Sequence, residues 1–270
     1  MGYLRENLSR EFKWRQVFLQ YESSQDFYYS SWQRGRSLLP LLVARTLIFL
    51  LCLAIVIASV VLTVNMNYGG YWLIYMTHWG LLINTLAAGC GVYVSLRGYF
   101  GEPAESGFEL PWYVKTYWVL HNAAVTMALL ISIFYWAFLT DSAEGQEYAV
   151  DKVLDYFIHA VNSVAMLLLL LSGRQEFRVM HVLHALAFAT IFLLFSLIYY
   201  AAGGTNGLGN DFIYPTMDWS RPGFSALNSV LTVIMIVLIH LLVVAVAAAR
   251  DGLGRWWRGG SNKLSVSEGY

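Results

Sequence analysis

Residues 39–63 read LLPLLVARTLIFLLCLAIVIASVVL, and the only charge in this run is Arg45, whose side chain we expect to extend back to the headgroups. A helix needs about 20 apolar residues to cross the hydrocarbon core of a bilayer. Five further runs meet or approach that length, at about 71–96, 113–139, 155–172, 179–201 and 226–249. Barrel strands would be shorter and would alternate apolar with polar residues. The sequence therefore predicts an all-α fold, a polytopic membrane bundle of six transmembrane helices.

The composition agrees with a lipid environment. Of the 270 residues, 58% are hydrophobic and 13% are charged, about half the charged fraction of a typical soluble domain. This composition predicts the lipid bilayer as a partner. The formal net charge is zero, so the sequence predicts no nucleic acid as a partner. Both cysteines, Cys52 and Cys90, fall in apolar runs, which argues against a disulfide framework.

The distribution of cations predicts the orientation of the bundle. Fourteen Lys and Arg residues fall in the N-terminal segment, around the second and fourth connections, and in the tail, whereas the other connections hold Lys152 and Arg221. Positive residues stay on the cytoplasmic side. We therefore predict that both termini are cytoplasmic, with residues 1–38 as an N-terminal segment, 39–249 as the transmembrane domain and 250–270 as a tail.

Three polar residues are predicted at similar depth in the outer half of the bilayer. At 1.5 Å per residue, Thr77 lies roughly 9–10 Å below the outer end of its span and His159 roughly 6 Å below its own. Asn162 follows His159 by one turn. A threonine hydroxyl becomes a useful nucleophile beside a base, and the usual base is histidine. The candidate catalytic residues are therefore Thr77, His159 and Asn162, with Asn162 as an oxyanion donor.

A structural explanation of the same residues stays open at this point. Thr77 would then hydrogen-bond its own helix backbone, and His159 would bond a neighbouring span.

A second group of histidines lies nearer the cytoplasmic side: His121, His181, His184 and His240. Paired histidines across a bundle can ligate haem or a transition metal, so haem binding is a further alternative. The sequence has no Cys-x-x-Cys-His and no His-Glu-x-x-His motif. We therefore predict no metal site and no cofactor.

The connection at 202–225 is the longest of those predicted to face outward. Its glycines permit positive φ and its prolines fix φ, so we expect an ordered lid, with a slack glycine-rich connector as the alternative. A protein partner at this loop is the corresponding hypothesis. Its motif residues are Gly203, Gly204, Thr205, Asn206, Tyr214, Pro215, Asp218, Trp219, Pro222 and Gly223.

Three stretches together resemble the rolling stone family of membrane proteins. They are Glu11-Phe12 through the region 28–32, the run YFIHAVN at 156–162, and the run IYYAAGGTNGLGNDFIYPTMDWSRPG at 198–223. The resemblance extends from about Glu11 to Asp251. It implies a multi-pass plasma-membrane protein with a role in myoblast fusion and muscle development.

A shorter stretch, YMTHWGLL at 75–82, is similar to the second span of the androgen-induced family of membrane hydrolases. Those enzymes cleave fatty-acid esters of hydroxy fatty acids with a threonine and a histidine from separate spans. By position, Thr77 matches their threonine and His159 their histidine. Asn162 departs from their pattern, in which a second histidine-containing motif is expected. This resemblance implies an intramembrane lipid ester hydrolase, with a lipid as substrate.

Overall fold

The computed structural model of the chain describes residues 14–21, 23–101, 109–140 and 151–259, and every regular element in these ranges is helical. The long helices are α2 (Leu39–Asn65), α3 (Met76–Phe100), α4 (Trp112–Phe134), α7 (Asn162–Ser172), α8 (Val182–Ala201) and α9 (Pro222–Trp257). The shorter elements are η1 (Trp14–Val17), η2 (Ser24–Phe27), η3 (Gly69–Ile74), η4 (Tyr135–Leu139), α6 (Lys152–Tyr156), η5 (Phe157–Val161), η6 (Val179–His181) and η7 (Pro215–Met217).

Six helical segments in the described ranges are long and apolar enough to cross a membrane, which confirms the predicted fold class. Three of them are composite. The third span joins α4 to the π-helical turn η4, the fourth joins α6 to α7 through the π-helical turn η5, and the fifth joins η6 to α8. The sixth runs on to Trp257, well past the predicted end at 249.

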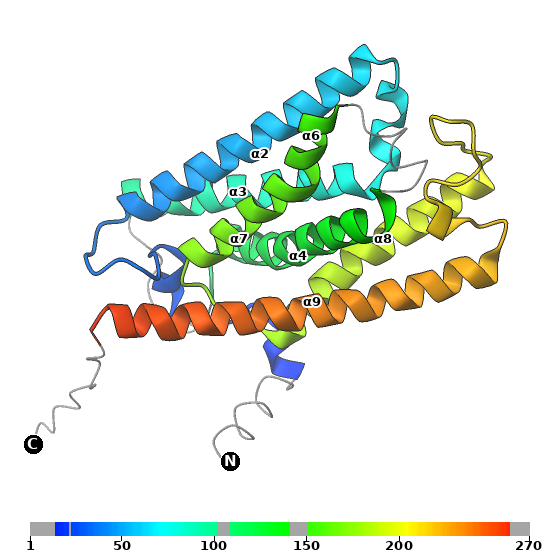
Figure 1. The fold of residues 1–270 in the computed structure, drawn as a ribbon. Coiled ribbons are helices and arrows are strands. Elements are labelled where there is room, and N and C mark those ends of the chain that lie inside the picture. Colours follow the sequence, from blue (N-terminus) through cyan, green and yellow to red (C-terminus); the bar gives the residue numbers. More distant parts are fainter. Residues whose placement is uncertain (1–13, 22, 102–108, 141–150, 260–270) are drawn as a thin grey trace, which may run out of the picture.

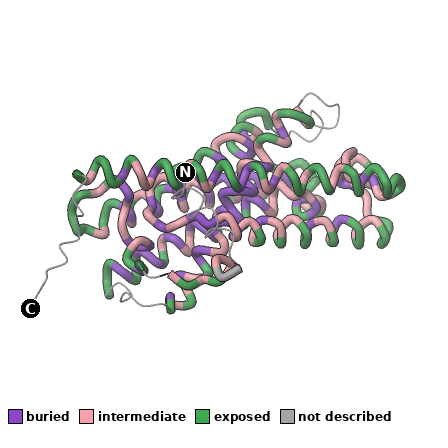
Figure 2. Tube along the Cα trace, turned by 90° about the horizontal axis from the view of Figure 1, so that it is seen from below, coloured by how far each residue is buried: buried purple, intermediate pink, exposed green. Residues whose placement is uncertain are grey.

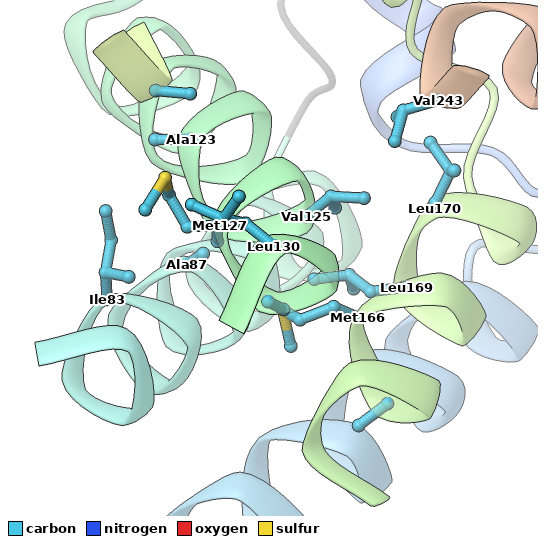
Figure 3. Packing of buried hydrophobic residues seen from close by; sticks show 14 of the residues in the cluster. Ile83, Ala87, Ala123, Val125, Met127, Leu130, Met166, Leu169, Leu170 and Val243 are labelled. Carbon is cyan, nitrogen blue, oxygen red and sulfur yellow. The ribbon is translucent and has the colours of Figure 1, made fainter. Parts of the chain in front are cut away.

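Helix α4 is the centre of the bundle (Figure 1) and packs against α3, α7, α8 and α9. Its residues from His121 to Ala128 are all buried, as expected for a helix surrounded by other helices. Small side chains such as Ala124 and Ala87 let α3 and α4 approach closely. Figure 3 shows Met127 and Leu130 of α4 filling the core together with Leu169 of α7.

The outer surface of the bundle is apolar, and buried residues are concentrated between the helices (Figure 2). Helix α8 exposes Ile191, Leu194 and Ile198, and α9 exposes Leu231 and Leu238. A contiguous apolar surface of this extent is not maintained in water, so these faces contact lipid. The chain is therefore a multi-pass membrane protein.

The N-terminal segment and the C-terminal end of α9 lie at the same end of the bundle, here called the terminal end. The Nε and Nη2 of Arg34 donate to the carbonyl of Trp257, and the Trp257 indole donates to the carbonyl of Trp32. The first and last described segments lie on one side, which fits the six spans found in the described ranges. The cytoplasmic location of that side stays a prediction. The opposite end, formed by η3 and the 202–221 connection, is called the loop end.

Arg45 does not extend to the headgroups as we expected. Its side chain is fully buried, and its guanidinium donates to the carbonyl of Phe27, to Ser95 Oγ at 2.8 Å and to Tyr117 Oη at 3.2 Å. The expectation was wrong because Phe27, from the N-terminal segment, packs under the bundle and offers an acceptor. Residues 14–38 are therefore a folded layer of the terminal end where they are described.

Candidate functional site

The second span begins at Met76 rather than at 71, and this shift positions Thr77. Residues Gly69–Ile74 form a 3₁₀ turn, after which Tyr75 is extended (φ −92°, ψ 131°) and α3 starts. The corner is held by Trp72, whose ring stacks on His78 at 4.4 Å and whose indole donates to Ser59 Oγ at 2.9 Å. Thr77 is therefore in the first turn of α3, at the loop end.

His78 has a structural part in the same corner. Its Nδ1 hydrogen-bonds the carbonyl of Trp72, and because a carbonyl only accepts, Nδ1 is the protonated nitrogen. The Tyr75 ring contacts the His78 ring edge-on. His78 thus holds η3 against α3.

The fourth span begins with a capped turn and then widens around His159. Asp151 is the N-cap, and its carboxylate accepts from the N–H groups of Val153 and Leu154 at 2.9 Å. The backbone then passes through the π-helical turn η5, which contains His159. Single π turns inside α-helices are frequent at functional sites. The turn brings the buried His159 ring toward α3.

Thr77, His159 and Asp155 form a chain of three polar groups. The Thr77 Oγ1 lies 3.5 Å from His159 Nε2, and His159 Nδ1 lies 2.9 Å from Asp155 Oδ1 and 3.2 Å from the Asp155 carbonyl. Because both atoms near Nδ1 are acceptors, the imidazole carries its proton there, and Nε2 is free to accept from the threonine. A contact of 3.5 Å is long for a hydrogen bond, and such contacts tighten when substrate binds. The arrangement is nucleophile, base and orienting carboxylate.

Tyr135 fixes the last two members of this chain. Its hydroxyl donates to Asp155 Oδ2 at 2.5 Å, and its ring stacks on His159 with centroids 3.5 Å apart and planes within 4°. Tyr135 opens the π-helical turn η4, so both stacked rings belong to π-helical turns. The carboxylate thereby has a partner on each oxygen, and the imidazole is held flat against one face.

The structural explanation left open for Thr77 does not fit its hydroxyl. Six threonines within the spans donate to the carbonyl four residues earlier in their own helix: Thr46, Thr63, Thr85, Thr116, Thr126 and Thr232. For Thr77 that carbonyl belongs to Leu73, outside α3, and it accepts from the Trp79 indole at 2.7 Å. The Thr77 hydroxyl faces His159 instead.

The chain of polar groups opens onto a cavity of about 120 Å³, here called the loop-side chamber. Its wall contains Thr77, Asp155 and His159 together with Ser59 and Thr63 of α2. On this measure of volume a single water needs about 10–15 Å³, so the chamber has room for several waters or a small polar group. The base and the nucleophile are thus accessible from a partly polar space.

The 202–221 connection covers this chamber and is tied down at several points. Gly207 and Pro215 line the chamber, and the Tyr214 hydroxyl accepts from the Met76 N–H at 2.9 Å. The buried Asn206 side chain accepts from the N–H groups of residues 208 and 210, which closes a tight turn. The segment is therefore an ordered cover, as the glycine and proline pattern predicts.

The far end of the connection is held to α8 and α9. The Trp219 indole donates to Ser196 Oγ at 3.1 Å, and the Asp218 carbonyl accepts from Ser225 Oγ at 2.6 Å. The Asp218 carboxylate accepts from Ser220 and Arg221, and these bonds hold the pKa of Asp218 below its ordinary value.

The remaining motif residues serve the backbone of the cover. Gly203 has φ +76°, and a Cβ on Gly204 would lie 2.5 Å from the Tyr199 ring. The Thr205 carbonyl accepts from the Tyr199 hydroxyl at 2.8 Å. Pro222 starts α9, and Gly223 has open space around it. Replacement by a residue with a side chain is therefore least tolerated at Gly203, because of its positive φ, and at Gly204, because a Cβ has no space there.

The structure brings Thr77 and His159 together but leaves Asn162 apart from them. Asn162 is buried at the start of α7 and is absent from the described lining of the loop-side chamber. Two residues that we did not predict, Asp155 and Tyr135, complete the site instead. Asp155 precedes His159 by four residues, a spacing that puts two side chains on one helix face. Tyr135 belongs to another span, so no spacing in the sequence relates it to His159.

The inner histidines do not form a facing pair of ligands. His240 Nε2 donates to the Arg178 carbonyl at 3.0 Å and its Nδ1 contacts Thr126 Oγ1 at 3.0 Å, so both ring nitrogens are engaged. The His181 and His184 rings are 4.9 Å apart and inclined by 52°. Within the described residues, no three His, Cys, Asp or Glu side chains are grouped to hold a metal ion. The haem alternative gains no support from this arrangement.

Comparisons with known proteins agree on one family. The family profile described as Protein rolling stone matches residues 4–255. The chain is 32% identical over 205 residues to Protein rolling stone of Drosophila melanogaster, which covers 73% of this chain and 72% of that protein. No solved structure matches. The profile match extends across Thr77, His159 and the cover.

Proposed function

Since the chain belongs to the rolling stone family and is a multi-pass membrane protein, we propose that it is a threonine-dependent hydrolase of fatty-acid esters within the membrane. The family is the one that the sequence motifs predict. The observation that carries the proposal is the chain Thr77–His159–Asp155 on the wall of the loop-side chamber. It has the nucleophile, base and orienting group that covalent catalysis requires.

In the proposed reaction, the Thr77 oxygen attacks the ester carbonyl carbon while His159 Nε2 takes the hydroxyl proton. The tetrahedral oxyanion then collapses, the bond from carbon to the alkoxy oxygen breaks, and His159 returns the proton to the departing alcohol. Water attacks the acyl-threonine by the same route, with His159 again accepting and returning one proton. The carboxylic acid leaves and Thr77 regains its hydrogen. Asp155 stabilises the imidazolium formed in each half-reaction.

The start of α3 supplies the groups that would stabilise the oxyanion. Thr77 is the second residue of the helix, so its N–H has no acceptor within the helix, and the positive end of the helix dipole is directed at the site. The Tyr214 hydroxyl lies at the same helix end. We assign the oxyanion to this helix terminus. The alternative, Asn162 as the oxyanion donor, stays a prediction, and Asn162→Ala tests it.

Purified protein tests the hydrolase proposal with fatty-acid esters and a fluorophosphonate probe. We expect wild type to hydrolyse the esters and to be labelled on the α3 peptide, and Thr77→Ala and His159→Ala to do neither. Thr85→Ala is the matched control, since Thr85 is in the same helix and bonds its own backbone. Wild-type rates in Thr77→Ala, or no turnover and no labelling in wild type, would show that the proposal is wrong.

The family resemblance motivates a second proposal, a role in myoblast fusion at the plasma membrane with a partner at residues 202–225. Asp211 is an exposed position of the cover and belongs to the surface that a partner would contact. Restoring wild type, Thr77→Ala or Asp211→Arg to fusing cells that lack the chain separates the two proposals. Fusion lost only with Asp211→Arg, at normal surface expression, supports a partner, and fusion lost only with Thr77→Ala ties the role to hydrolysis. Full fusion with both variants contradicts both roles.

A further inference from the structure

Thr77 lies at the junction of two cavities. The second cavity, of about 270 Å³, is here called the membrane-side chamber and lies between α4, α8 and α9. Four residues line both chambers: Thr77, Tyr135, Leu139 and Tyr214. A molecule with its reacting atom at Thr77 therefore has one space on each side of that atom.

The two chambers differ in their ionisable groups. Asp155 and His159 line the loop-side chamber alone. Among the described residues, the wall of the membrane-side chamber has no acidic, basic or histidine side chain; it combines apolar side chains such as Ile131 and Leu193 with neutral polar ones such as Asn228 and Thr232. Apolar chain atoms are at low free energy in the second space, whereas an alcohol and water are better placed in the first.

The membrane-side chamber also reaches the lipid-facing surface. Among its lining residues, Phe138 is 61% exposed and Leu231 is 53% exposed. These side chains belong to different spans and face the hydrocarbon region. A lipid therefore reaches the chamber laterally from the bilayer, without passing through the loop end.

We propose that the membrane-side chamber binds the acyl chain of the ester, with its carbonyl at Thr77 and its alcohol part in the small loop-side chamber. The inference rests on the proposed hydrolase function and names its substrate class: esters of one medium-length or long acyl chain with a small polar alcohol. The acyl group that stays on Thr77 is the part held in the apolar space.

The depth of the chamber gives a chain length. Its lining runs from Phe138 in η4 to Leu130 in α4 along the third span, and from Asn228 to Ile236 along α9, which at 1.5 Å per residue is about 12 Å in each span. An extended chain advances about 1.2 Å per bond. The chamber thus encloses about ten carbons beyond the carbonyl, and further carbons extend into lipid. Turnover should rise with acyl length up to about ten carbons and then level off.

A plug inside the chamber tests this assignment. Ala189 lies one helical turn deeper than Leu193, so Ala189→Phe closes the chamber about 6 Å from its end at Leu193. The acyl length at which turnover levels off should then fall from about ten to about five carbons. Ile191→Phe is the control, because Ile191 is on the same helix but on its lipid face. The assay measures the release of free fatty acid from glycerol monoesters with acyl chains of four to sixteen carbons. An unchanged length profile in a folded Ala189→Phe protein overturns the assignment.

A labelling experiment on wild-type protein needs no variant and no turnover. A ten-carbon fatty acid with a diazirine at its methyl end should label peptides around Leu186 and Met235, deep in the chamber. Labelling around Ser59 and Thr63 would show that the acyl chain binds in the loop-side chamber instead. Labelling of lipid-facing residues alone would overturn acyl binding in either chamber. If the deep peptides are labelled but no ester is hydrolysed, acyl binding stands and the hydrolase proposal fails. If esters are hydrolysed without chamber labelling, only this inference fails.

Discussion

Asp155→Asn is the substitution that best separates a catalytic site from a set of packed polar side chains. The asparagine keeps the size of the side chain but removes its charge and one of its two acceptors. Asp155 now accepts from His159 at 2.9 Å and from Tyr135 at 2.5 Å. An amide oxygen can serve one of these donors, and the amide nitrogen then faces the other as a second donor. The variant therefore weakens the orientation of the imidazole and loses its electrostatic support.

The expected size of the effect follows from the partners of His159 Nδ1. In a Ser-His-Asp triad, the same replacement lowers kcat about 10⁴-fold, largely because the wrong tautomer is favoured. Here the Asp155 backbone carbonyl, at 3.2 Å from Nδ1, keeps an acceptor beside the ring after the substitution. We therefore expect a smaller loss, about 10²–10³-fold in kcat, equivalent to about 2.7–4.1 kcal/mol of transition-state stabilisation. KM should change little, because Asp155 orients the base rather than the ester.

The assay is steady-state hydrolysis of a ten-carbon ester by purified protein, with thermal unfolding measured on each variant. Asp211→Asn is the matched control, since it removes the same charge at an exposed position of the cover that is not among the residues lining either chamber. It should reduce kcat only a few-fold. An Asp155→Asn enzyme as fast as this control, while Thr77→Ala is inactive, would refute the assignment of Asp155 as the orienting group.

Tyr135→Phe keeps the stacked ring but removes a hydrogen bond to a carboxylate, so we expect a loss of about tenfold in kcat, with a larger loss in Tyr135→Leu; equal rates in the two variants would contradict a positioning role for the ring. Arg45→Met leaves several buried acceptors without a donor and should lower the free energy of unfolding by at least about 3 kcal/mol. The exposed Arg36→Met is its control in a denaturation series, and equal midpoints would count against the burial argument. The lowered pKa of Asp218 means that its carboxylate stabilises the cover above its ordinary pKa of about 3.9 and that this contribution is lost as the pH falls through the lowered value. Hydrogen exchange across the cover should therefore be faster in Asp218→Asn than in wild type at pH 6, and the difference should shrink as the pH falls through the lowered pKa of Asp218; a difference that is independent of pH would exclude this explanation.

The spans were predictable because each apolar run is long enough to indicate a transmembrane helix. Some of the helix boundaries were not predictable. Residues 71–75, YWLIY, are as apolar as a span, yet they form a 3₁₀ turn and an extended residue. The cause is a contact between distant parts of the sequence: Trp72 bonds Ser59 of α2. Arg45 shows the same limit, because its acceptors at Phe27 and Gly91 come from other segments. Apolar length is a local property, and the satisfaction of a buried polar group is not.

The candidate site divides along the same line. Thr77 and His159 were found because a hydroxyl and an imidazole at similar depth are a recognisable pair, and Asp155 was available from its spacing to His159. The stacked Tyr135 required the register of two π-helical turns in different spans, which residue patterns do not give. Asn162 was chosen for lying one turn after His159, and the structure places it at the start of α7, directly after the π-helical turn η5. Its assignment as the oxyanion donor stays a prediction.

The position of the cover changes which hypothesis the family-specific sequence favours. Two of the three stretches that resemble the rolling stone family, residues 156–162 and 198–223, meet at one cavity, where the first supplies His159 and the second supplies the Tyr214 hydroxyl. Asn206 and Asp218 are buried within the cover and hydrogen-bond its backbone, so their side chains stabilise the conformation of the cover. A surface that existed only to be recognised by a partner would need its distinctive side chains outside. Of the motif residues, Tyr214 and Pro215 line the loop-side chamber, and Asn206 and Asp218 are buried within the cover, which is the arrangement expected of a lid over a reaction chamber.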